Sequence, residues 1–207
     1  VDFIICDHHN PGDIVPNCIV LDPKQIDCSY PFKELSGCGV GFKLLEAVYQ
    51  KKAWDKQDLL ENLDLLAVSI GADIVAVTGE NRILCSYGMT LLNERPRPAF
   101  QELLKIAKRD FPVSLTDVVF TIAPRINAAG RMDDAKKAVQ LFIEKDATKA
   151  LEFAQMLQSD NLDRREADSS ITEDALAQII NDPSHAGKKT TFVYSENWHK
   201  GVVGIVA

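Results

Sequence analysis

Short apolar runs near the start of the chain alternate with longer stretches whose apolar residues recur at helical spacing. Val1–Cys6 and Cys18–Leu21 are mostly apolar, and each is stopped by polar or turn-forming residues. Runs of this length between turn signals are typical of strands buried in a parallel sheet. The first run ends at Asp7-His8-His9, and open α/β sheets bind ligands at the carboxyl ends of their strands. We therefore expect an α/β fold with a functional sheet edge at residue 7.

Helical periodicity dominates most of the remaining chain. Ser36 is suited to be the N-cap of the first helix, because its hydroxyl can accept a bond from a backbone amide in the first turn. Loops are expected over Lys24–Leu35 and Arg95–Pro98, a turn over Thr78–Arg82, and a strand over Thr190–Ser195. The pattern predicts helices beginning near Gly37 and spanning Gln57–Ile70, Arg82–Asn93, Ala99–Arg109, Asp134–Glu144 and Thr148–Asn181. The pair Asp133-Asp134 is expected at a helix N-terminus.

The glycines at 37, 39 and 41 allow two interpretations. Glycines before a helix can leave free amides for a phosphate, or they can let the helix pack tightly on a sheet. The stretch contains neither a GxGxxG pattern nor a Walker lysine, so we favour packing. In the last long helix, the charged stretch 160–168 is expected to be solvated rather than a binding patch.

Composition and charge narrow the class of protein. The hydrophobic content of 46% is enough for a core, and no apolar run is long enough to span a membrane. Five cysteines, odd in number and without CxxC spacing, predict reduced thiols and a cytosolic (cytoplasmic) protein. The net charge of −7 argues against a generally basic nucleic-acid-binding surface. Since the chain begins inside a predicted strand and ends abruptly at Ile205-Val206-Ala207, we expect it to be part of a longer protein.

Candidate chemistry lies at two acidic positions. In Asp7-His8-His9, His8 can be a metal ligand and His9 can contact a phosphate. Asp7 can orient His8 by accepting its ring hydrogen or a backbone amide. The alternative is that these polar side chains are simply solvated. Asp73 is bracketed by small and apolar residues, where a charge is costly unless it is paired or bound to metal. Alternatively, Asp73 could bond to backbone amides at a helix end.

Candidate substrate contacts lie further along the chain. Arg125, Asn127 and Arg131 surround a predicted small-residue turn, and arginine forks pair well with phosphate oxygens. We expect at least one of the two arginines to face the substrate, Arg131 more than Arg125. The alternative is that one arginine makes an internal salt bridge. His199 could contact phosphate or could only cap the following helix.

The stretch Cys6-Asp7-His8-His9-Asn10 resembles the signature of the DHH phosphoesterase superfamily. Further stretches resemble its RecJ branch, the single-strand-specific DNA exonucleases, and they occur in the family's order. They are Ser36–Lys43, Gly71–Val75, Thr78–Arg82, Pro124–Met132 and Asn197–Ala207.

The resemblance implies a DHH domain over 1–146, a connecting helix over 147–183 and the start of a DHH-associated (DHHA1) α/β domain over 188–207. It implies a two-metal site for Mn²⁺ or Mg²⁺, with His8 and Asp73 as ligands and Asp7 and His9 as further catalytic residues. Family aspartate motifs expected upstream of the Asp-His-His strand would complete the ligand set, so we expect this piece to be inactive alone.

The resemblance also implies hydrolysis of single-stranded DNA from its 5′ end in repair and recombination, with Arg125, Asn127, Arg131, His9 and His199 near the substrate. A helicase and a single-strand-binding protein are implied as partners, and no membrane is implied. Two alternatives stay open. One is another DHH phosphoesterase acting on oligoribonucleotides, cyclic dinucleotides or pyrophosphate, and the other is a non-catalytic replication scaffold.

Overall fold

The computed structural model describes residues 1–132 and 134–207. These residues form two compact units, Val1–Ala123 and Pro124–Ala207, and each is described by itself. The domain limits at residues 146, 183 and 188 remain predictions. Within the described ranges, no helix is both long and apolar enough to cross a membrane.

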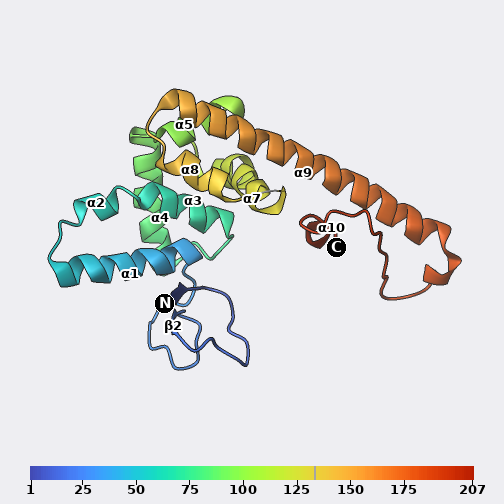
Figure 1. Ribbon diagram of the computed structural model, residues 1–207, viewed down its shortest axis with the longest axis horizontal. Helices are drawn as coiled ribbons and strands as arrows, with labels where there is room; N and C mark the ends of the chain where they lie inside the picture. Colours follow the sequence, from blue (N-terminus) through green and yellow to red (C-terminus); the bar gives the residue numbers. More distant parts are fainter. Residues whose placement is uncertain (133) are drawn as a thin grey trace. The chain divides into compact units, whose positions relative to one another are not determined.

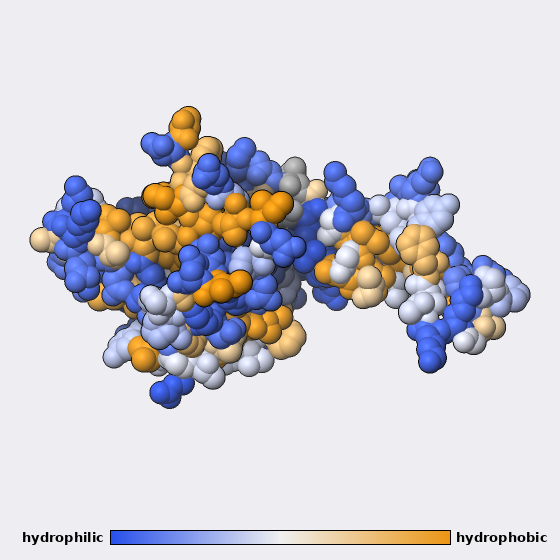
Figure 2. All heavy atoms as spheres, turned by 90° about the horizontal axis from the view of Figure 1, so that it is seen from below, coloured by the Kyte–Doolittle hydropathy of each residue, from blue (hydrophilic) through white to orange (hydrophobic). Residues whose placement is uncertain are grey.

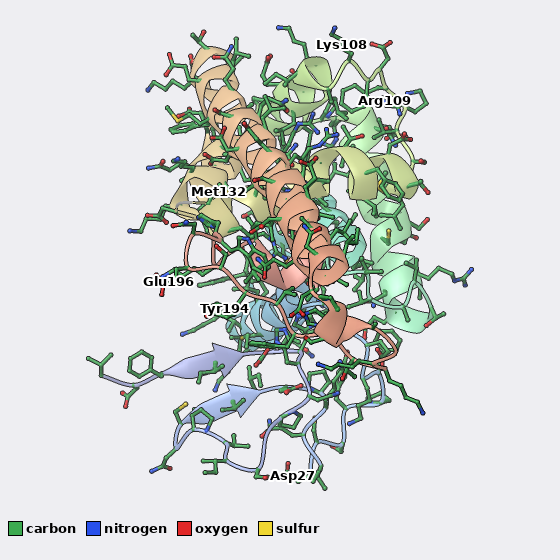
Figure 3. The ribbon with its side chains drawn as sticks, turned by 90° about the vertical axis from the view of Figure 1, so that its right-hand side faces the viewer. Asp27, Lys108, Arg109, Met132, Tyr194 and Glu196 are labelled. Atoms are coloured by element: carbon green, nitrogen blue, oxygen red, sulfur yellow. The ribbon has the colours of Figure 1, made fainter. Side chains whose placement is uncertain are left out.

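The first unit begins with two short parallel strands. β1 (Ile4–Cys6) pairs with β2 (Ile19–Leu21), with Ile4 opposite Ile19, and Figure 3 shows the two arrows side by side. The amide of Asp7 donates to the carbonyl of Leu21 at 3.0 Å, so pairing continues to the Asp-His-His triplet. Both predicted strands are confirmed.

The expected burial of the first strand is not observed. Phe3 is 66% exposed and Ile4 is 55% exposed, because β2 is the one strand that pairs with β1 among the described residues. Apolar side chains are accordingly visible on the face of the molecule seen from below (Figure 2), and the exposed large apolar residues of this region are Val1, Phe3, Ile4, Ile14, Val15, Ile19 and Ile26.

Helices make up the rest of the first unit (Figure 1). They are α1 (Gly37–Lys52), α2 (Gln57–Leu60), α3 (Leu63–Ala72), α4 (Gly79–Glu94), α5 (Pro98–Ile106), α6 (Leu115–Asp117) and the π-helix η1 (Val118–Ile122). A core of buried side chains joins α1 to α4: Phe42, Leu59, Leu63, Leu66, Ile70 and Cys85. At Gly88 of α4, an added Cβ would overlap the carbonyl of Leu63, so the absence of a side chain lets α3 and α4 pack closely.

Local capping was predicted correctly at the start of α1, and two helix limits were wrong. The Ser36 hydroxyl accepts a bond from the Gly39 amide at 3.1 Å, as expected of an N-cap. The predicted helix Gln57–Ile70 is interrupted after Leu60, and α3 restarts at Leu63. The predicted turn Thr78–Arg82 is instead the first turn of α4, with Thr78 as its N-cap residue.

The second unit contains α7 (Ala123–Met132, whose first residue lies in the first unit), α8 (Lys136–Ile143), α9 (Ala147–Asn181), the 3-10 helix η2 (Pro183–His185) and α10 (Val203–Val206). The long helix α9 confirms the prediction for Thr148–Asn181 and begins at an Asp146 side chain that accepts from the Lys149 amide at 3.0 Å. It packs against α8, and Leu141 of α8 and Leu157 of α9 are both fully buried.

Three expectations for the second unit were wrong. The small-residue turn around Asn127 is helical, within α7. Asp160 and Asn161 of α9 are 9% and 5% exposed, so the solvated stretch does not begin at residue 160. Residues 190–195 form no strand, since no described segment pairs with them. Of the expected Asp133-Asp134 helix start, Asp133 lies outside the described residues, and Asp134 accepts from the Lys136 amide at 2.9 Å.

Candidate active site

Asp7 organises the turn at the end of β1. Its Oδ1 accepts the His8 amide at 2.7 Å, the His9 amide at 3.2 Å and the His9 Nδ1 at 2.7 Å. The hydrogen bond from the His9 ring, followed by those from the two amides, lowers the pKa of Asp7 to about 2. Asp7 is therefore an anion at neutral pH. Of the two predicted ways for Asp7 to orient His8, the structure shows the bond from the backbone amide.

His8 and Asp73 meet although they are far apart in the sequence. His8 Nε2 lies 3.9 Å from Asp73 Oδ2, and the two side chains are 18% and 36% exposed. A Cβ added to Gly37 would be 3.4 Å from His8 Cδ2, so this glycine allows the start of α1 to approach the imidazole. The contact favours the packing interpretation for Gly37.

Asp73 is the C-cap residue of α3, and its amide donates to the Ser69 carbonyl at 2.9 Å. Its carboxylate lies 3.4 Å from the Ser69 hydroxyl, which also donates to the Ser36 hydroxyl at 3.0 Å. The Asp73 carboxylate therefore lies beside a pair of serine hydroxyls rather than beside local backbone amides. Since the separation from His8 is only slightly larger than that of two ligands on one ion, both side chains fit one corner of a metal site.

The donor set in this corner is small. Nowhere in residues 1–132 and 134–207 do three or more His, Cys, Asp or Glu side chains gather as a metal site would require. An imidazole with a carboxylate suits manganese better than a purely oxygen-lined site would. His9 is 76% exposed at its side chain, with its ring centroid 4.5 Å from that of His8, so its imidazole faces solvent beside the corner.

The arginines of α7 differ in their surroundings. Arg125 is half-buried, and its Nε donates to Gln158 Oε1 at 2.8 Å; burial and the nearby positive charge of Arg165 lower its pKa. Arg131 is exposed, as is Asn127. Arg125 therefore takes part in internal packing with an amide partner, whereas Arg131 and Asn127 are accessible to a ligand.

Gly201 brings Arg131 and His199 together within the second unit. The Arg131 Nη1 donates to the Gly201 carbonyl at 3.3 Å, and the Gly201 amide donates to His199 Nδ1 at 3.2 Å. A Cβ at Gly201 would overlap the Arg131 carbonyl. Two of the predicted substrate residues are thus neighbours, while His199 also stabilises the turn before α10, as its alternative role requires.

Several residues of these sites were not foreseen from the sequence. Gly201 was seen only as part of a loop, and Ser69 carried one usable signal, its position four residues before Asp73 on a helix. Asn81 of α4 is another such residue: it is buried and bonds to the backbone on both sides of the His8–Asp73 corner.

Comparison with known proteins gives consistent matches. The family model described as the DHH family, N-terminal domain, matches residues 1–70. The single-stranded-DNA-specific exonuclease RecJ of Bacillus subtilis is 36% identical over all of this chain, and that of Escherichia coli is 34% identical, again over all of it. A crystal structure of exonuclease RecJ bound to manganese is 32% identical and superposes with a TM-score of 0.84 over the whole chain.

A crystal structure of RecJ in complex with Mg²⁺ from Thermus thermophilus is 30% identical, with a TM-score of 0.81. The match confirms the α/β fold class. The chain spans 26% of the Bacillus protein, 38% of the Escherichia protein and 51% of the manganese-bound chain.

Proposed function

Because residues 1–70 match the DHH family model and the whole chain is similar to RecJ exonucleases, we propose that it belongs to the DHH family and forms part of the catalytic core of a single-stranded-DNA-specific exonuclease. The observation that carries the proposal is the meeting of His8 and Asp73 at a sheet edge, in a chain that superposes on a manganese-bound RecJ. We also propose a DHH domain over 1–146, a connecting helix over 147–183 and the beginning of a DHHA1 domain over 188–207.

The residues of the corner have separate roles in this proposal. His8 and Asp73 would hold Mn²⁺ or Mg²⁺, together with ligands from other parts of the protein. When bound, such ions polarise a phosphodiester and supply hydroxide near neutral pH. Asp7 holds the backbone of both histidines and the ring of His9. The exposed His9 imidazole would then contact the scissile phosphate or the leaving group.

The second unit would contact the DNA backbone. Exposed Arg131 and its neighbour His199 present a guanidinium and an imidazole, and Asn127 adds an amide. Arg125 would act mainly through packing. Because the net charge is −7, we expect phosphate binding to be confined to such local groups.

We extend the proposal to the biological setting. Digestion would run from the 5′ end during DNA repair and recombination, in the cytoplasm, with a helicase and a single-strand-binding protein as partners. The cysteines described by the structure are all free thiols, which agrees with a reducing compartment.

The decisive experiment measures Mn²⁺-dependent degradation of single-stranded DNA labelled at either end by the full-length protein. His8→Ala and Asp73→Asn should each lower the rate at least about 100-fold, because each removes a metal ligand. Asp58→Asn is the matched control, since Asp58 is an exposed carboxylate on α2, and it should leave the rate unchanged. The 207-residue chain run beside them should bind Mn²⁺ weakly and degrade little DNA, because its corner offers two ligands.

Other outcomes would replace the proposal. Cleavage of short RNA or a cyclic dinucleotide with single-stranded DNA spared would indicate another DHH phosphoesterase. Loss of the 3′ label before the 5′ label would reverse the digestion polarity. Absence of hydrolysis on every substrate would favour a scaffold.

A further inference from the structure

Two loops bracket the His8–Asp73 corner. One ends at Leu35 and Ser36, both almost fully buried, and leads into Gly37 at the start of α1, which packs against the His8 ring. The other leaves α3 at Asp73 and runs to the start of α4. The distance between the two candidate ligands therefore depends on how these loops are held relative to each other.

The loop after Asp73 has a strained backbone. Ile74 has φ +54°, in the left-handed region, which β-branched residues rarely adopt. Its amide donates to the Gly71 carbonyl at 3.3 Å, and α3 is tightly packed there, since a Cβ at Gly71 would lie 3.0 Å from the Leu115 side chain. A strained conformation persists only where the surrounding structure fixes it.

The side chain of Asn81 also fixes the loop that follows Asp73. Its side chain is fully buried, and its Nδ2 donates to the Ala76 carbonyl at 3.0 Å and to the Glu34 carbonyl at 2.5 Å. One amide group thus bonds to the loop that leads from Asp73 and to the loop that leads to Gly37. The orientation of this amide is fixed, because both of its contacts are carbonyl oxygens and only the nitrogen can donate to them.

The bonding of Asn81 is also incomplete. Its Oδ1 is buried and has no hydrogen-bond partner among the residues that the structure describes. An unsatisfied buried acceptor costs stability, so the contribution of this side chain comes from its two donor bonds, which join the two loops.

We propose that Asn81 is a positioning residue, which fixes the separation of His8 and Asp73 by bonding to both loops and thereby sets the affinity of the corner for a divalent metal. The inference rests on the proposed function. Residues that orient metal ligands change metal affinity by about 10- to 100-fold when they are replaced.

The test measures Mn²⁺ binding to the full-length protein at 10 °C by the electron paramagnetic resonance signal of free Mn²⁺, beside the melting temperature. Asn81→Ala and the milder Asn81→Ser, which keeps one donor, should raise the Mn²⁺ Kd about 10- to 100-fold. Their DNA cleavage should fall at low Mn²⁺ and recover at saturating Mn²⁺. Asn93→Ala is the matched control: Asn93 lies on the same helix and bridges to the Val113 backbone through two bonds of 2.9 and 2.7 Å. It should lower the melting temperature but leave the Kd within about threefold.

Each result decides the matter. A Kd unchanged in Asn81→Ser, or equal changes at positions 81 and 93, would overturn the inference while leaving the proposed function intact. An unmodified protein that neither binds Mn²⁺ nor degrades DNA would instead refute the proposed function. The unmodified protein gives a check that needs no variant: by linkage, Mg²⁺ binding should slow hydrogen exchange of the Asn81 side-chain amide, and no slowing would count against the role.

Discussion

Replacing Gly88 with alanine should destabilise the protein, although alanine is the better helix former. Gly88 lies in α4 where this helix crosses α3. A Cβ there would be 2.7 Å from the Ala67 Cβ and would overlap the Leu63 carbonyl, whereas ordinary contact begins at 3.4 Å. The two helices would have to separate by roughly 1 Å in a packed core, which cannot absorb such a shift without cost.

The net effect can be estimated from two opposing contributions. Overpacking a core typically costs about 1–3 kcal/mol, and the upper end applies here because a backbone carbonyl cannot rotate away. The gain in helix propensity from glycine to alanine offsets about 1 kcal/mol of that cost. We therefore expect a loss of about 2 kcal/mol, which corresponds to a fall of about 4–8 °C in melting temperature for a chain of this size.

Gly41→Ala is the matched control. Gly41 also lies inside a helix, α1, but a Cβ there would meet nothing within 4 Å. Only the propensity gain remains, so this variant should raise stability by up to about 1 kcal/mol. Thermal and urea denaturation of both variants would check that Gly88→Ala lowers the free energy of unfolding and Gly41→Ala raises it. If Gly88→Ala were as stable as Gly41→Ala, the close packing of α3 on α4 would be refuted.

Three further predictions concern charged and polar groups. Arg97→Ala should cost about 3–5 kcal/mol in urea denaturation, because it leaves the 1%-exposed Asp64 carboxylate without its ion-pair partner. The pKa of Asp7 is lowered to about 2, so its stabilising effect is present above about pH 4 and lost as the pH falls through about 2; His9→Ala should raise this pKa toward 3.8 in a carbon-13 NMR titration. Burial and an adjacent carboxylate raise the pKa of Tyr30, so its phenol should ionise above pH 10 and later than exposed tyrosines in an ultraviolet titration.

Features that depend on neighbouring residues were predictable from the sequence. The Ser36 N-cap was predicted. The Asp146 cap of α9 and the bond between Asp7 and His9 were not predicted, but they are equally local, because each side chain lies within three residues of its partner. Periodicity also placed the major helices. These interactions are local, so the pattern of residue types is sufficient to predict them.

Features that depend on distant contacts were missed. The break between α2 and α3 coincides with the bond from Arg97 to Asn62, 35 residues apart in the sequence. Ala128 and Ala129 are small because they are buried in α7, and a small-residue run cannot by itself distinguish a packed helix from a turn. The strand expected at 190–195 needs a partner for its backbone groups, and periodicity does not reveal one.

The same limit applies to the site. Asp73 could be singled out because a charge among apolar residues is costly, and its pairing with His8 came from the resemblance to a family. Asn81 and Gly201 could not be singled out, since their bonds join residues 47 and 70 positions apart. Their importance is apparent only once the backbone is folded.

The length of α9 has a consequence for how the second unit unfolds locally. At 1.5 Å per residue, its 35 residues span roughly 52 Å, so the two ends share no neighbours. Most of its buried positions lie between Ala150 and Asn161, and beyond them Ile171 is the one buried residue of the helix. Amide protons near Asn181 should therefore exchange with solvent orders of magnitude faster than those beside α8. The last turns of α9, beyond buried Ile171 and the bond from Trp198 Nε1 to Asp174 Oδ2, can therefore unfold while the part beside α8 stays folded.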